Sequence, residues 1–296
     1  MRFLDTRSMP GHLFQYAPGR QAFASQPPPF ARCAILVGGL SDGMLACPYA
    51  PALTDALAKE GWATVQPLLR TSHLQFGFGS LDGDAEDLEA LLEHLGDGVE
   101  CALVGHSTGS QVAAHYVRKG GRVRHCVLQA GVSDRETDDA DELARRQPWL
   151  ERAAALVAEG KGDEFLPRAS HWAPMTAQRY LDLHAVGGKD DYFSSDLSDA
   201  AMTELYEGWD RGVGCLVAYS GADEYAPPSV DKAALVKRIC GFASANNAAR
   251  VVGLVIPGAN HNLSADAGAA ATFVDAVVAF LTGGAVAGAA FDSSSR

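Results

Sequence analysis

The chain has 296 residues, a length that suits one large α/β domain or two small ones. Apolar residues make up 47% of it, which is enough for a substantial core and excludes a disordered chain. The formal net charge of −12 excludes a general attraction for nucleic acid or for anionic membranes, because like charges repel.

The N-terminal residues and the cysteines favour a cytoplasmic protein. Charged residues and Pro10 interrupt every apolar stretch of the first thirty residues, so we expect no signal peptide, and no apolar run is long enough for a membrane span. The cysteines stand singly, with no C-x-x-C pair to hold zinc. Most fall in or beside apolar runs, where a free cysteine packs as a small hydrophobe, so we expect reduced core thiols.

Short apolar runs alternate with helical patterns from about residue 31 to residue 282. Before them, residues 13–16 and 21–25 could form a small antiparallel edge. The strand patterns, apolar and bounded by Gly, Pro or a charge, are at 33–37, 63–68, 101–104, 126–128, 215–219 and 251–256. Helical patterns are at 51–59, 82–95, 111–119, 230–240 and 267–281. Such alternation predicts right-handed βαβ units and a mainly parallel, doubly wound sheet.

The alternation stops between about residues 134 and 211. This segment is charged and rich in aromatic residues, and it holds helical patterns such as 150–159 but no strand pattern. An insertion of this length between two strands usually crosses the C-terminal edge of the sheet. We therefore expect a helical lid, inserted before the penultimate core strand, whose aromatic residues line a substrate pocket: Trp172, Tyr192 and Phe193. A helical embellishment with packed aromatic residues is the alternative.

These patterns define the expected domain organisation. Residues 1–282 are predicted to form a single domain that includes the insertion. Residues 283–296 are mainly Gly, Ala and Ser, a composition typical of a flexible C-terminal tail.

The pattern G-x-S-x-G occurs twice, and the context separates the two copies. Ser107, in G-H-S-T-G, follows a short apolar strand and leads directly into a helix, which is the setting of a nucleophile elbow. Ser41, in G-L-S-D-G, also follows a strand, but Pro48 and Pro51 delay the next helix. We therefore favour Ser107 over Ser41 as the nucleophile.

A nucleophilic serine needs a base and an orienting carboxylate, which in this architecture follow it in the order acid, then histidine. Only His261 stands just beyond the last predicted strand, whereas His106, beside the serine, is expected to point away and pack. Asp223 follows the strand at 215–219 and is the favoured acid. Asp134, which follows an earlier strand, and Glu224 stay open as alternatives.

Two backbone N–H groups are expected to form the oxyanion hole. One belongs to Thr108, directly after the nucleophile, and the other comes from the loop at 38–40, with Leu40 favoured. Gly39 lacks a Cβ, so the backbone can approach the substrate carbonyl there. No G-x-G-x-x-G and no Walker lysine is present, and no cofactor or metal is implied.

Several sequence segments together resemble one branch of the α/β-hydrolases. They are V-G-G-L-S-D-G at 37–43, G-H-S-T-G-S-Q at 105–111, L-Q-A-G-V-S-D-R-E at 128–136, D-D-Y-F-S-S-D-L at 190–197 and S-G-A-D-E-Y at 220–225. The branch is a family long labelled as of unknown function, found in fungi, plants and protists, which includes fungal siderophore esterases. The resemblance implies the α/β-hydrolase fold and an ester hydrolase with Ser107, Asp223 and His261 as its triad.

The resemblance leaves the substrate open. Its partner is expected to be a small-molecule ester, either an ordinary carboxylic ester or a siderophore-type ester. A thioesterase, amidase or lyase on the same triad is an alternative, and so is a ligand receptor that keeps the triad without turnover. The sequence predicts no oligomeric state.

Overall fold

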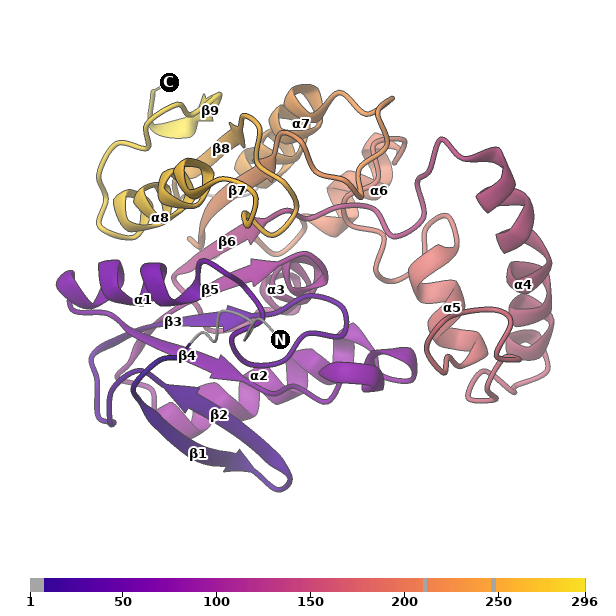
Figure 1. Ribbon diagram of the computed structural model, residues 1–296, viewed down its shortest axis with the longest axis horizontal. Coiled ribbons are helices and arrows are strands. Elements are labelled where there is room, and N and C mark those ends of the chain that lie inside the picture. The colour runs from indigo at the N-terminus through magenta and orange to yellow at the C-terminus, as the bar shows by residue number, and fades with distance from the viewer. Residues whose placement is uncertain (1–7, 210–211, 246–248, 296) are drawn as a thin grey trace, which may run out of the picture.

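A computed structural model describes residues 8–209, 212–245 and 249–295 of the chain (Figure 1). Within these residues a single sheet has the strand order β1-β2-β4-β3-β5-β6-β7-β8-β9. The strands are β1 (His12–Ala17), β2 (Arg20–Ala24), β3 (Arg32–Val37), β4 (Ala63–Pro67), β5 (Glu100–His106), β6 (His125–Gln129), β7 (Gly214–Ser220), β8 (Val251–Ile256) and β9 (Phe291–Asp292). From β4 to β8 neighbouring strands are parallel, and the pairings at both edges are antiparallel. The predicted sheet is confirmed.

Helices cover both faces of this sheet (Figure 1). Alternate residues of β3 supply two separate apolar layers: Ile35 packs into one and Leu36 into the other. A parallel central strand is therefore buried on both sides, which explains its continuous apolar sequence. The layer of Leu36 includes α1 (Ala50–Lys59) and α8 (Ala267–Leu281), and that of Ile35 includes α2 (Leu81–Leu95), α3 (Thr108–Arg118) and α7 (Lys232–Ala245).

The region between β6 and β7 is helical, as predicted. It contains α4 (Ala140–Ala158), α5 (Ala177–His184) and α6 (Asp199–Leu205), and we call residues 134–209 the insert. Helices α4 and α5 stand beyond one end of the sheet (Figure 1) and share a small apolar cluster with Phe76, which belongs to the short helix η1 (His73–Gly77). Residues 210–211, the end of the predicted lid, lie outside the described residues.

The segment at 283–296, predicted as a flexible tail, contacts the sheet in the part of it that the structure describes. β9 pairs antiparallel with β8, Ala290 donates a backbone hydrogen bond to Gly253 (2.8 Å), and Arg250 forms an ion pair with Asp292 (2.6 Å). Val286 is buried. Backbone pairing at a sheet edge needs no hydrophobic period, so the Gly- and Ser-rich composition gave no sign of it.

No helix of the described residues is both long enough and apolar enough to cross a membrane.

Candidate active site

Ser107 occupies a strained turn between β5 and α3. Its backbone has φ 54° and ψ −127°, in a region that non-glycine residues seldom adopt. Its N–H donates to the backbone carbonyl of Gln129 on the neighbouring strand β6 (3.0 Å), which fixes the turn to the sheet. The serine therefore lies at the carboxyl end of a central strand.

The two glycines that flank Ser107 are required by close backbone packing. A Cβ on Gly105 would lie 2.3 Å from the carbonyl oxygen of Gly109. A Cβ on Gly109 would lie 2.2 Å from the carbonyl oxygen of Val37 on β3. Both distances are shorter than any van der Waals contact, so the elbow can form only with glycine at these two positions.

His261 and Asp223 come from loops that follow β8 and β7, and they form a buried pair. His261 Nδ1 lies 3.0 Å and 2.8 Å from the two carboxylate oxygens of Asp223. Since the carboxylate accepts, Nδ1 carries the proton and Nε2 is left as a base. Glu224 does not bind the imidazole. Its carboxylate accepts a hydrogen bond from the backbone N–H of His261 (2.8 Å) and so holds the loop after β8 in place.

Gln129, at the end of β6, connects this pair to the residue beside the serine. Its Nε2 donates to the backbone carbonyl of His261 (3.0 Å), and its Oε1 accepts from His106 Nδ1 (2.5 Å). Burial, and then the nearby charge of His261, lowers the pKa of His106 to about 4, so His106 is neutral at neutral pH. Sequence reasoning missed Gln129. A single amide that ends an otherwise apolar strand was the available signal.

The loop after β3 passes directly against Ser107. A Cβ on Gly39 would lie 2.7 Å from Ser107 Cβ and 3.3 Å from its Oγ. The N–H of Gly39 donates to the carboxylate of Asp42 (2.8 Å), which leaves Leu40 as the donor that this loop could offer a substrate. Thr108 begins α3, where the helix has no acceptor of its own for the N–H.

A cavity of about 810 Å³ joins these groups, with Leu40, Ser107, Thr108 and His261 in its wall. Trp172 of the insert also lines it and is 57% exposed. The wall is strongly acidic, since it contains one arginine, Arg146, against seven carboxylates: Asp42, Asp134, Asp138, Asp139, Glu136, Glu142 and Glu224. Such a surface disfavours anionic ligands.

Two of the aromatic residues predicted to bind substrate lie elsewhere. Tyr192 (0% exposed) and Phe193 (2% exposed) belong to the main apolar core, and neither lines the large cavity. The hydroxyl of Tyr192 is hydrogen-bonded to His115 Nδ1 (2.8 Å). These two side chains therefore fasten the insert to the sheet, and of the three only Trp172 is brought to the cavity.

The alternative residues also have definite places. Asp134 lines the cavity, but its carboxylate accepts from the amide of Gln111 (2.9 Å) and forms no hydrogen bond with His261 among the described residues. Burial is the main cause that raises the pKa of Asp134 to about 7. Ser41 is exposed on the loop after β3, with φ 65°.

The fold and the strained turn place the protein among the α/β-hydrolases. Its structure resembles that of a siderophore hydrolase, EstB, from Aspergillus fumigatus, with a TM-score of 0.78, 27% identity and coverage of 95% of this chain and 99% of the other. A thermostable carboxyl esterase from Bacillus coagulans shares the fold, with a TM-score of 0.58 at 16% identity over 94% of this chain and 99% of the other.

The chain belongs to the family described as "Protein of unknown function (DUF1749)", which matches residues 4–282. A UPF0613 protein of Schizosaccharomyces pombe is 33% identical, over 77% of this chain and 80% of the relative. The fusarinine C esterase sidJ of Aspergillus fumigatus is 30% identical, over 78% of this chain and 83% of the relative.

Proposed function

We propose that the protein is a serine hydrolase that cleaves carboxylic esters through an acyl-enzyme, with Ser107 as nucleophile, His261 as base and Asp223 as orienting acid. The observation that carries the proposal is the buried His261–Asp223 pair, whose histidine shares one cavity wall with a serine in a strained elbow. Two similar proteins are named as a fusarinine C esterase and a siderophore hydrolase; the first name states ester hydrolysis, and the second states hydrolysis of a siderophore.

The proposed reaction has two steps. Nε2 of His261 takes the proton of the Ser107 hydroxyl as the oxygen attacks the ester carbonyl, and the N–H groups of Leu40 and Thr108 bind the oxyanion. The histidine then gives that proton to the departing alcohol. In the second step His261 takes a proton from water as the water attacks the acyl-enzyme, and it gives this proton to the oxygen of Ser107 as the acid departs.

We further propose that the insert is a lid that selects the alcohol part of the substrate. Its residues supply much of the acidic wall and also Trp172, and a cavity of about 810 Å³ has room for a large alcohol. The relatives' names make a siderophore-type ester a candidate substrate. The described cysteines are free thiols, which suits the cytoplasmic location that we propose.

A fluorophosphonate probe tests the proposal, because it forms a covalent adduct only with an activated serine. We expect peptide mass spectrometry to place the adduct on the peptide that contains Ser107. Ser107→Ala should abolish both labelling and the hydrolysis of p-nitrophenyl esters. Ser41→Ala is the matched control, since it changes the serine of the second G-x-S-x-G copy and should leave both intact.

Each other outcome points to a specific error. An adduct on Ser41 would transfer the nucleophile to the loop after β3. Labelling of Ser107 without turnover of any ester would favour a receptor that keeps a reactive serine. The absence of any adduct in folded protein would remove the hydrolase proposal.

A further inference from the structure

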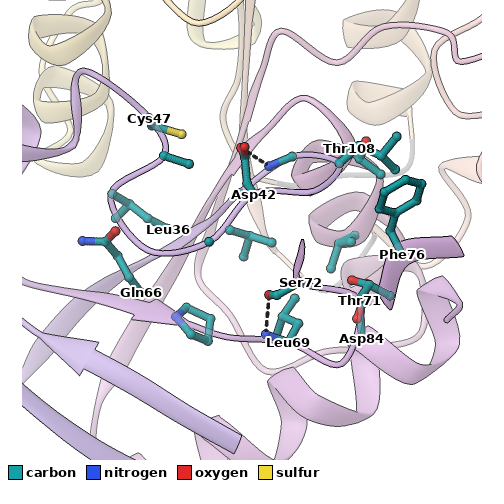
Figure 2. A pocket seen from close by; sticks show the side chains of 18 of the residues that line it. Leu36, Asp42, Cys47, Gln66, Leu69, Thr71, Ser72, Phe76, Asp84 and Thr108 are labelled. Atoms are coloured by element: carbon teal, nitrogen blue, oxygen red, sulfur yellow. Dashed lines mark hydrogen bonds between the residues drawn. The ribbon is translucent and has the colours of Figure 1, made fainter. Parts of the chain in front are cut away.

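A second, smaller cavity of about 40 Å³ is lined in part by the loop after β3 (Figure 2). It shares Gly39, Leu40 and Thr108 with the large cavity, so the two spaces meet at the proposed oxyanion hole. Its remaining wall comes from the ends of β3 and β4 and the loops that follow them, from α1, η1, α2 and α3, and from Arg179 of the insert. The apolar part of that wall includes Leu69 and Phe76.

The small cavity contains a buried carboxylate with an unused acceptor. Asp84, on the first turn of α2, is only 2% exposed. The hydroxyl of Thr71 donates to its Oδ2 (2.6 Å), and Figure 2 shows the two side chains together at the cavity wall. Oδ1 has no hydrogen-bond partner within the described part of the chain. A buried acceptor without a donor is costly, so Oδ1 calls for a donor from a bound molecule.

Neighbouring groups do not supply that donor. Ser80 already caps α2, because its side chain accepts the N–H of Gly83 (3.1 Å), so Asp84 is not needed as a cap. Arg179 of the insert lines the same cavity, but its guanidinium forms a buried ion pair with Asp190 (2.6 Å). Helix capping therefore does not explain why an aspartate is buried at position 84.

The reaction decides which part of an ester can enter this cavity. The departing alcohol must receive a proton from His261, so it must lie beside His261. His261 lines the large cavity and does not line the small one. The alcohol therefore occupies the large cavity, and the acyl group is the part of the ester that is left to extend from Ser107, across the shared residues Leu40 and Thr108, toward the small one.

On the basis of the proposed hydrolase, we propose that the small cavity is the acyl subsite and that it takes a short acyl chain whose hydroxyl or ammonium group donates to Asp84 Oδ1. The volume sets the length of the chain. A water molecule needs roughly 10–15 Å³ of such space, so about three or four non-hydrogen atoms fit beyond the carbonyl. Long unbranched acyl chains do not fit.

A set of ethyl esters tests the assignment, with the released acid titrated at a constant pH of about 8, above the pKa of Asp84 (about 7), so that the carboxylate accepts. In derivatives of butanoate, a hydroxyl or an amino group at carbon 2, 3 or 4 is compared with a methyl group at the same carbon. At one position we expect the donor to raise kcat/KM about tenfold or more over the methyl isostere. Ethyl octanoate should be a poor substrate.

Two substitutions at Asp84 separate the effect of its hydrogen-bond acceptor from the effect of its side-chain shape. Asp84→Leu should abolish the preference for the donor, while Asp84→Asn should keep it for the hydroxyl, since the amide oxygen still accepts. Asp87→Asn is the matched control on the same helix. Asp87 is also buried, but it binds Arg70 and lies outside the cavity, so acyl preference should not change.

The wild-type panel is decisive even if a variant fails to fold. The assignment is overturned if the enzyme hydrolyses butanoate yet prefers no donor at any carbon, or accepts octanoate equally well. It is also overturned if Asp84→Leu keeps the donor preference. Failure of the hydrolase proposal looks different, because Ser107 then takes no fluorophosphonate and no ester of the panel is cleaved.

Discussion

The sheet and the insert hold their functional side chains by different means. At the sheet, Ser107, Asp223 and His261 stand on turns that directly follow buried strands, and backbone hydrogen bonds and apolar layers fix those turns. In the insert, helices α4 and α5 share only a small apolar cluster, and buried ion pairs join segments of the insert to one another: Arg135 with Asp191 (2.6 Å) and Arg179 with Asp190 (2.6 Å).

This contrast teaches where chemistry and selectivity are located. Strand ends can hold reacting atoms in place because neighbouring strands fix the backbone on both sides. A helical segment held by charges can change its cavity-facing residues without disturbing those strands. We therefore expect substitutions at the strand ends to reduce kcat, and substitutions in the insert to change stability and KM.

The largest effect is expected at the strand ends. Asp223→Asn keeps the size of the side chain but removes the acceptor that fixes the His261 tautomer, so kcat should fall by roughly 10³ to 10⁴. Steady-state kinetics on a p-nitrophenyl ester measures the loss. Asp134→Asn is the control, and we expect it to cost less than tenfold. The reverse result would move the acid to the loop after β6.

Substitution of a buried ion pair of the insert is expected to reduce the free energy of unfolding strongly and to affect kcat less directly. Arg135→Gln removes the partner of Asp191, whose side chain is 1% exposed, and an uncompensated buried charge costs about 3–5 kcal/mol. Denaturant unfolding measures this loss. Arg118→Gln breaks the exposed pair with Glu204 and should cost less than about 1 kcal/mol. Equal losses in the two variants would contradict the view that buried charges hold the insert.

The sequence predicted the sheet because strands and helices have local hydrophobic periods. It also predicted positions for the proposed nucleophile, acid and base, because each of these residues stands just after a strand that could be recognised. The edge strand β9 was missed, since a short pairing between backbone groups leaves no period in the sequence.

Side-chain partners were harder to predict than element positions. Aromatic residues in a charged segment suggested a pocket, yet Tyr192 and Phe193 fill the core, and periodicity cannot tell which wall a side chain joins. Gln129 and Asp84 gave no motif either. Their significance depends on groups more than ten residues away, which only the folded chain brings together.

Asp84, the buried carboxylate in the wall of the small cavity, allows a test based on the pH dependence of stability. This cavity has residues of both the sheet region and the insert in its wall. The pKa of Asp84 is raised from 3.8 to about 7, mainly by burial; Thr71 and Arg179 lower this pKa, and the charge of Asp87 raises it. Between pH 4 and pH 7 the folded protein therefore keeps a proton that the unfolded chain has released. Its stability should fall as pH rises through this window.

Asp84→Asn removes that titration. In urea unfolding at several pH values, the wild type should lose stability relative to the variant, on the order of 2–4 kcal/mol between pH 4 and pH 8. Asp87→Asn should not remove this pH-dependent loss. Parallel curves for wild type and Asp84→Asn would show that Asp84 titrates normally in the folded protein.

The smallest effects are expected at two aromatic residues of the insert. One of them, Trp172, lines the large cavity, and the other, Tyr192, fastens the insert to the sheet. Trp172→Ala opens the wall of the large cavity, so KM for an ester of a bulky aromatic alcohol should rise about fivefold, with stability unchanged. Tyr192→Phe removes the hydroxyl bound to His115, which should cost about 1 kcal/mol of stability and leave KM unchanged.

Ethyl butanoate is the control substrate, because its small alcohol cannot reach Trp172. If Tyr192→Phe instead raised KM without loss of stability, Tyr192 would bind substrate, and the insert would contribute more to the cavity than its wall residues indicate.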